Sequence, residues 1–175
     1  MSEAKRNVVI RPEQPKDFAA VRHLNLAAFP SPAEANLVDE LRANAKAALS
    51  LVAVQDNRIV GHILFSPVTV ESNNGEYPVV GLAPMAVLPE FQRKGVGSLL
   101  VTAGLARCKR AGVGSVIVLG HADYYPRFGF EKASQFGVRC EYDVPDEYFM
   151  LVELIEGVGD RISGMVRYRS EFANV

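Results

Sequence analysis

The chain has 175 residues, of which 49% are hydrophobic and 22% are charged, as in an ordinary globular domain with a substantial core. Its 19 basic and 20 acidic residues give a formal net charge of −1. This balance excludes the strong positive charge expected of a general nucleic-acid-binding or membrane-binding protein. We therefore predict one domain over residues 1–175, with neither nucleic acid nor membrane among its partners.

The chain contains only two cysteines, Cys108 and Cys140, and no CxxC pair or Cys/His cluster. This pattern predicts neither a disulfide framework nor a metal site, and we expect both thiols to be inert. Residues 1–13 lack the apolar core of a signal peptide, and no apolar run approaches the ~18 residues of a membrane span. A cytoplasmic location is therefore expected.

The first third of the chain predicts one strand and two helices. Residues 7–11 form a strand that Pro12 ends, and residues 15–29 carry apolar residues at helical spacing, with Asp17 placed to cap that helix. Residues 32–45 predict a second short helix. The two apolar faces comprise Phe18, Val21, Leu24 and Ala28 in the first helix and Leu37, Val38 and Leu41 in the second.

The next segment predicts a meander of three strands, over residues 49–54, 58–71 and 78–88. The turn between the last two contains Asn-Gly at 74–75, a strong hairpin signal. Pro84 interrupts the third strand, and proline cannot donate to a sheet ladder. We therefore expect a bulge or a separation from a neighbouring strand there, opening a slot in the sheet.

A strand-helix-strand unit follows, with a helix at 95–112 and a buried strand at 115–120. The expected apolar face of this helix comprises Val96, Leu99, Leu100, Ala103 and Ala106. Residues 123–130 indicate a short turn or helix, and residues 147–155 and 163–169 predict two closing strands. The order of elements predicts a mixed α/β sheet.

The stretch "QRKGVG" at the start of the third helix has the properties of an anion site. The N–H groups of a first helical turn are free, and the helix dipole favours negative charge. Gly95 and Gly97 leave room for a phosphate, while Arg93 and Lys94 add positive charge. The stretch lacks the GK[ST] of a P-loop, and Leu100 stands near where a dinucleotide fingerprint needs its third glycine.

Two motifs in this order resemble the GCN5-related N-acetyltransferase (GNAT) family. The first is Gln92 to Gly97, with a lead-in of Val87, Pro89 and Phe91; the second, Tyr-x-x-x-Gly-Phe, is Tyr125, Gly129 and Phe130. The resemblance extends over essentially the whole chain. It implies an α/β GNAT fold, in which helices flank a mixed, mostly antiparallel sheet that is split at its central parallel strand pair.

The resemblance also implies a cofactor site and a reaction. Backbone N–H groups from Arg93 to Ser98 would hold the pyrophosphate of acetyl-CoA, and the main chain of Met85 to Val87 would pair with its pantetheine arm. A primary amine would attack the thioester directly, and Tyr125 would protonate the departing thiolate. The implied cofactor positions are Met85, Ala86, Val87, Gln92, Arg93, Lys94, Gly95, Val96, Gly97 and Ser98.

The general base stays open at this stage. Many members of the family carry a glutamate on the strand before the glycine turn, but "GLAPMAV" contains no carboxylate. The candidates are His121, Glu34, Glu71, Glu76 or a water chain, and histidine can act as a base near neutral pH.

Three further alternatives also stay open. The domain could bind acyl-CoA as a non-catalytic sensor, or it could transfer a longer acyl group. The closing strands could also support a homodimer.

Overall fold

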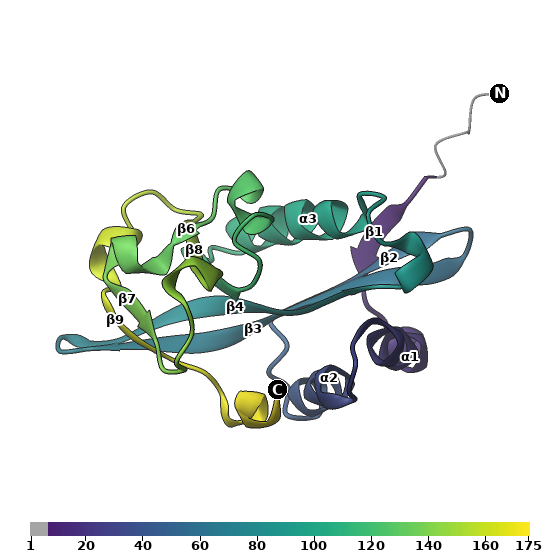
Figure 1. The fold of residues 1–175 in the computed structure, drawn as a ribbon, viewed down its shortest axis with the longest axis horizontal. Helices are drawn as coiled ribbons and strands as arrows, with labels where there is room; N and C mark the ends of the chain where they lie inside the picture. The colour runs from purple at the N-terminus through teal and green to yellow at the C-terminus, as the bar shows by residue number, and fades with distance from the viewer. Residues whose placement is uncertain (1–6) are drawn as a thin grey trace.

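The computed structural model describes residues 7–175, and its elements follow the predicted order (Figure 1). The expectation that the chain begins without a signal peptide rests partly on residues 1–6, which lie outside the described residues. The helices are α1 (Phe18–Ala28), α2 (Ala33–Ala43) and α3 (Val96–Arg110). The strands are β1 (Val9–Pro12), β2 (Leu49–Gln55), β3 (Arg58–Ser72), β4 (Gly75–Val87), β5 (Ser115–Leu119), β6 (Glu131–Lys132), β7 (Val138–Cys140), β8 (Phe149–Glu153) and β9 (Gly164–Arg167).

The strands form one mixed sheet in the order β1-β2-β3-β4-β5-β8-β6, and β9 pairs with β3 and β7. Most pairs are antiparallel, while β4 and β5 form a parallel pair near the centre. Helices α1 and α2 cover one face, and α3 covers the other (Figure 1). The predicted fold class, a mixed and mostly antiparallel sheet flanked by helices, is confirmed. The short strands β6 and β7 were not predicted, because two or three residues carry no readable alternation.

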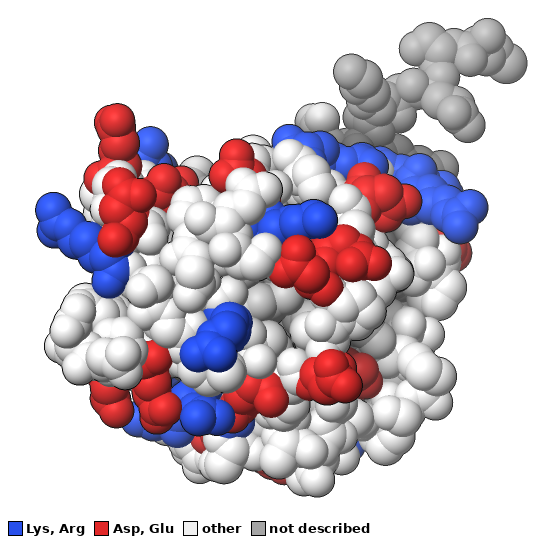
Figure 2. Space-filling model, turned by 60° about the vertical axis from the view of Figure 1, so that its left-hand side comes forward, with Lys and Arg blue, Asp and Glu red and all other residues white. Residues whose placement is uncertain are grey.

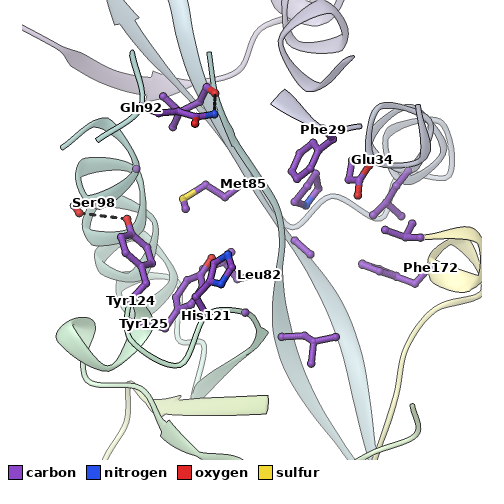
Figure 3. Close-up of a pocket in the computed structure, with 18 of the residues that line it drawn as sticks. Phe29, Glu34, Leu82, Met85, Gln92, Ser98, His121, Tyr124, Tyr125 and Phe172 are labelled. Atoms are coloured by element: carbon purple, nitrogen blue, oxygen red, sulfur yellow. Dashed lines mark hydrogen bonds between the residues drawn. The ribbon is translucent and has the colours of Figure 1, made fainter. Parts of the chain in front are cut away.

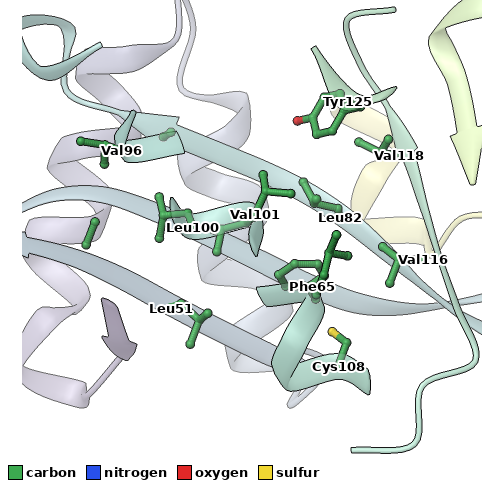
Figure 4. Close-up of a cluster of buried hydrophobic side chains, with 14 of the residues drawn as sticks. Leu51, Phe65, Leu82, Val96, Leu100, Val101, Cys108, Val116, Val118 and Tyr125 are labelled. Carbon is green, nitrogen blue, oxygen red and sulfur yellow. The ribbon is translucent and has the colours of Figure 1, made fainter. Parts of the chain in front are cut away.

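Helix α3 packs on the sheet through an apolar stripe that meets Leu51, Phe65, Leu82 and Val116 (Figure 4). The stripe consists of Val96, Leu100, Val101, Leu105 and Cys108. The predicted face is therefore partly wrong, since Leu99 is 47% exposed and Ala106 is exposed as well. The reason is Gly104, where a Cβ atom would lie 2.4 Å from the Phe65 ring, so the helix turns this glycine toward the sheet.

The opposite face of the sheet is covered by α1, α2 and the C-terminal segment. The predicted faces are confirmed at Val21, Leu24, Leu37, Val38 and Leu41, all of which are buried. The predicted capping role of Asp17 is wrong for α1, because its carboxylate accepts bonds from the Arg11 guanidinium and the Gln14 N–H. The hydrogen bond from Arg11 lowers the pKa of Asp17.

The sheet opens at Pro84, as predicted from the sequence. The β4–β5 pairing ends at Leu82 and Val118, although β4 continues to Val87 against β3. The β3–β4 register also shifts between Ile63 and Phe65, opposite Pro84. A stretch of β4 beyond Leu82 therefore has an open edge that faces the start of α3.

The surface carries charges of both signs. On the face shown in Figure 2, acidic and basic side chains are interspersed, with no broad patch of one sign. Among the described residues, no helix is long and apolar enough to cross a membrane.

Candidate active site

A cavity of about 1190 Å³ lies at the split in the sheet and is lined from both of its faces (Figure 3). We call its two halves the α3 side and the α2 side. The α3 side is lined by Met85, Val87, Phe91, Gln92, Arg93, Gly95, Gly97, Ser98, Tyr124 and Arg127. The α2 side is lined by Phe29, Glu34, Leu37, Tyr142, Val144, Tyr168, Phe172, Ala173 and Val175. Between them lie Leu82, Ala83, Pro84, Leu119, Gly120, His121 and Tyr125.

The glycine turn opens α3 toward this cavity. Gly95 has a φ of +87°, a conformation that favours glycine, and its carbonyl accepts the first helical bond from the Leu99 N–H at 3.1 Å. The N–H groups of Val96, Gly97 and Ser98 precede that bond and have no acceptor inside the helix. Gly97, Ser98 and Arg93 line the cavity at the place where the sequence predicts an anion site.

The open edge of β4 continues from this turn into the cavity. The Leu88 N–H donates to the Val60 carbonyl of β3, so strand alternation directs the polar backbone groups of Val87 and Met85 to the open edge. The Gln92 side chain caps one of them, with Nε2 donating to the Val87 carbonyl at 3.0 Å (Figure 3). An extended ligand can pair with the groups that remain.

Tyr124 forms the wall opposite Met85 on the α3 side. Its hydroxyl lies 3.2 Å from Ser98 Oγ (Figure 3). The Arg127 guanidinium lies 4.8 Å from its ring centre. A Cβ atom at Gly97 would lie 3.0 Å from this hydroxyl and 3.5 Å from Met85 Cε. No site role was predicted for Tyr124, but its hydroxyl lies at the first turn of α3.

Tyr125 lies deeper, at the point where β4 and β5 separate. Its ring packs edge-on against Tyr124 and Phe130, with centroids 5.1 and 5.6 Å away. Burial raises the pKa of the Tyr125 phenol to about 12. The side chain nevertheless lines the cavity, so it presents a protonated hydroxyl group at neutral pH.

Two of the four residues proposed as a base reach the cavity. His121 follows β5, and its carbonyl accepts the Tyr124 and Tyr125 N–H groups, so it anchors the turn that carries both tyrosines. Glu34 projects from the first turn of α2 (Figure 3). Glu71 and Glu76 face each other on the distant β3–β4 hairpin and do not line the cavity. Glu71 instead pairs with Arg167 at 3.0 Å.

Three of the expected cofactor positions do not line the cavity with their side chains. Ala86 and Val96 are buried in the core, and Lys94 Nζ lies 5.8 Å from the Phe91 ring centre at the outer rim. Most residues of the α2 side were not predicted as site residues. Tyr168 and Phe172 reach it because β9 crosses back to pair with β3, a long-range pairing that leaves no local motif.

Cys108 and His62 are buried in the core and do not line the cavity. Cys108 is buried in the core, and burial raises its pKa to about 11, as expected of an inert thiol. His62 is fully buried on β3, with Nε2 2.8 Å from Ser50 Oγ. Among residues 7–175, no group of three or more His, Cys, Asp or Glu side chains is placed to hold a metal ion.

The geometry thus combines free N–H groups at a helix start, an open strand edge and a protonated phenol in one cavity. This fold and site define a class of acyltransferases. The chain matches the acetyltransferase (GNAT) family over residues 18–130, and it belongs to that family. The predicted family and the predicted acyltransferase class are both confirmed.

The chain is similar to the uncharacterized N-acetyltransferase YhbS of Escherichia coli (strain K12), with 34% identity over 166 residues, 94% of this chain and 98% of the relative. The crystal structure of Escherichia coli YhbS in complex with CoA matches with a TM-score of 0.91 and 32% identity, covering 99% of this chain and 96% of that one. A GNAT family acetyltransferase from Brucella melitensis, in complex with acetyl-CoA, matches with a TM-score of 0.79 and 35% identity, covering 95% and 99%.

Proposed function

We propose that this protein transfers the acetyl group of acetyl-CoA to a primary amine by direct attack of the amine on the thioester. The observation that carries the proposal is the continuity of one cavity from the glycine turn, along the open edge of β4, to Tyr125. These features have the order of a phosphate, an extended arm and a reactive end in one ligand. The CoA and acetyl-CoA held by the two similar structures support this ligand.

In this proposal the backbone from Arg93 to Ser98 binds the pyrophosphate, and the open edge of β4 at Met85 and Val87 pairs with the pantetheine. Gln92 orients the rim through its bond to the Val87 carbonyl. The hydroxyl groups of Tyr124 and Ser98 lie beside the same path and offer further hydrogen bonds to the arm. Lys94 contributes positive charge to the pyrophosphate site, and Val96 contributes its backbone N–H group. The side chains of both residues lie outside the cavity wall.

The chemistry at the reactive end follows from acidities. The nitrogen lone pair of the neutral amine forms a bond to the acetyl carbon while the carbon–sulfur bond breaks. A thiolate is the conjugate base of a thiol of pKa ~8.5, so it is a good leaving group that needs only one proton. Tyr125 holds that proton because burial raises its pKa to about 12, and it donates the proton as the charge on sulfur develops.

The amine must lose a proton before or during attack, and we assign that proton to His121. The residue lines the cavity between its two sides and precedes Tyr125 by four residues in sequence (Figure 3). Its backbone carbonyl accepts the N–H groups of Tyr124 and Tyr125, so the proposed base and the proposed acid lie on the same turn. The proton leaves to solvent from His121, because this residue is exposed at the mouth.

Calorimetric titration with acetyl-CoA and CoA tests the proposed site. We expect binding in the wild-type protein and loss of binding in Gly97→Asp, which places a carboxylate where the pyrophosphate lies. Ala106→Asp adds the same charge to an exposed position of α3 and should bind normally. Binding that survives in Gly97→Asp would contradict the proposed site. Binding without acetyl transfer to any amine would favour a non-catalytic acyl-CoA sensor, and tighter binding of longer thioesters would favour a longer acyl group.

A further inference from the structure

The α2 side of the cavity has a distinct chemical character, set by a wall of aromatic side chains. Tyr142 stacks on Tyr168 with centroids 5.5 Å apart, and Tyr168 packs against Phe172 at 5.3 Å. Phe29, which follows α1, lines the same half. Burial raises the pKa of both tyrosines, so the wall is uncharged. Such a wall favours an apolar or aromatic group, and aromatic faces also attract cations.

Glu34 places a carboxylate on this otherwise apolar side. Its side chain extends from α2 toward the gap between the halves, on the side of Phe29 and Phe172 (Figure 3). Within residues 7–175, its Oε2 atom is buried and has no hydrogen-bond partner. A buried carboxylate oxygen without a partner is costly, and a cationic ligand would satisfy it.

The basic side chains that line the cavity lie on the α3 side. Among the described residues that line it, Arg93 and Arg127 belong to the α3 side, and the α2 side contains no lysine or arginine. An acceptor that carried a carboxylate or phosphate into the α2 side would meet Glu34 and no compensating charge. This distribution separates an anionic cofactor from a cationic acceptor.

We propose that the acceptor is a primary amine with an aromatic or bulky apolar body and no anionic group. This inference rests on the proposed acetyl transfer. Glu34 binds the ammonium form of the amine, and the rings of Tyr142, Tyr168 and Phe172 bind its body. Glu34 is thus a substrate-binding residue, while His121 takes the proton that the ammonium group loses before it attacks.

The test compares three probe amines with acetyl-CoA by measuring the acetylated products. 2-Phenylethylamine has the proposed chemistry, L-phenylalanine adds a carboxylate to the same body, and spermidine is a cation without an apolar ring. We expect kcat/KM for 2-phenylethylamine to exceed the other two by at least about tenfold, because the carboxylate of phenylalanine repels Glu34 and spermidine buries no ring against the aromatic wall. Preference for L-phenylalanine or spermidine would overturn the proposal.

A variant pair tests the role of the carboxylate. Glu34→Gln should raise KM for 2-phenylethylamine about tenfold or more, whereas its affinity for CoA should be unchanged. Glu40→Gln removes an exposed carboxylate of the same helix and should leave both values unchanged. An unchanged KM in Glu34→Gln would overturn the assignment. Failure of the wild-type protein to bind acetyl-CoA would instead contradict the proposed function. Failure of the acceptor assignment and failure of the proposed function are therefore distinguishable.

Discussion

The ring of Tyr125 lies directly on the backbone of Gly120. A Cβ atom at position 120 would be 2.3 Å from Cε2 of that ring and 2.9 Å from Cδ2. No side chain fits there while Tyr125 keeps its place. Gly120, the residue after β5, therefore leaves free the space that the ring of the proposed acid occupies.

We predict that Gly120→Ala lowers kcat by about 100-fold, because displacing a catalytic group by about 1 Å has effects of this size. Affinity for CoA should change little, since the glycine turn is remote in sequence and on another element. Steady-state kinetics combined with calorimetry separates the two quantities. Gly81→Ala is the matched control, because its new Cβ would lie at an ordinary 3.4 Å from Val68. An unchanged kcat in Gly120→Ala would contradict a positioned Tyr125.

Tyr125→Phe should lower kcat by about 100-fold or more and leave affinity for CoA unchanged, because only the proton donor is lost. Since burial raises the pKa of Tyr125 to about 12, the wild-type enzyme should lose no activity through this group between about pH 7 and about pH 10. Tyr124→Phe is the matched variant and should keep most of kcat. If Tyr124→Phe is the more damaging change, the acid is Tyr124.

His121→Gln should reduce kcat at neutral pH by about 10-fold to 100-fold, and the loss should shrink as pH rises. The reason is that a larger fraction of the amine is already neutral in alkaline solution and needs no base. Tyr125→Phe should show no such recovery, so pH profiles distinguish the two roles. His23→Gln, at an exposed position of α1, serves as the control. A loss in His121→Gln that is independent of pH would argue against a base.

The buried His62 predicts sensitivity to acid. Burial lowers the pKa of His62 to about 3, from about 6.5 when the chain is unfolded. As pH falls below about 6.5, His62 binds a proton in the unfolded chain but stays neutral in the folded protein. The free energy of unfolding therefore decreases. The slope approaches about 1.4 kcal/mol per pH unit down to about pH 3. Stability above about pH 6.5 is unaffected by this group.

Urea denaturation between pH 7 and pH 4 measures this slope. His62→Gln should reduce it, because the amide cannot take up the proton and can still bond to Ser50. His23→Gln should keep the wild-type slope. Equal slopes in the wild-type protein and His62→Gln would show that other groups determine acid unfolding.

The sequence determined the local features of this protein. Helix periodicity, the glycines at 95 and 97 and the interruption at Pro84 are encoded in short stretches. The succession of helices and strands along the chain, the start of α3 and the split in the sheet could therefore be predicted. The family motifs followed from the same stretches, because a phosphate cradle is built by consecutive backbone groups. The candidate bases could be named for the same reason, as residue types in particular segments.

The tertiary structure decided everything that joins distant stretches. Only packing showed that Gly104 turns α3 so that Leu99 is exposed, and that Gly120 supports Tyr125. Glu71 and Glu76 are the same residue type as Glu34, but the fold places only Glu34 and His121, among the four candidate bases, in the cavity. The aromatic wall at Tyr168 and Phe172 depends on β9 pairing with β3 across about half of the chain. Such contacts join segments that are far apart in sequence, and no local pattern specifies them.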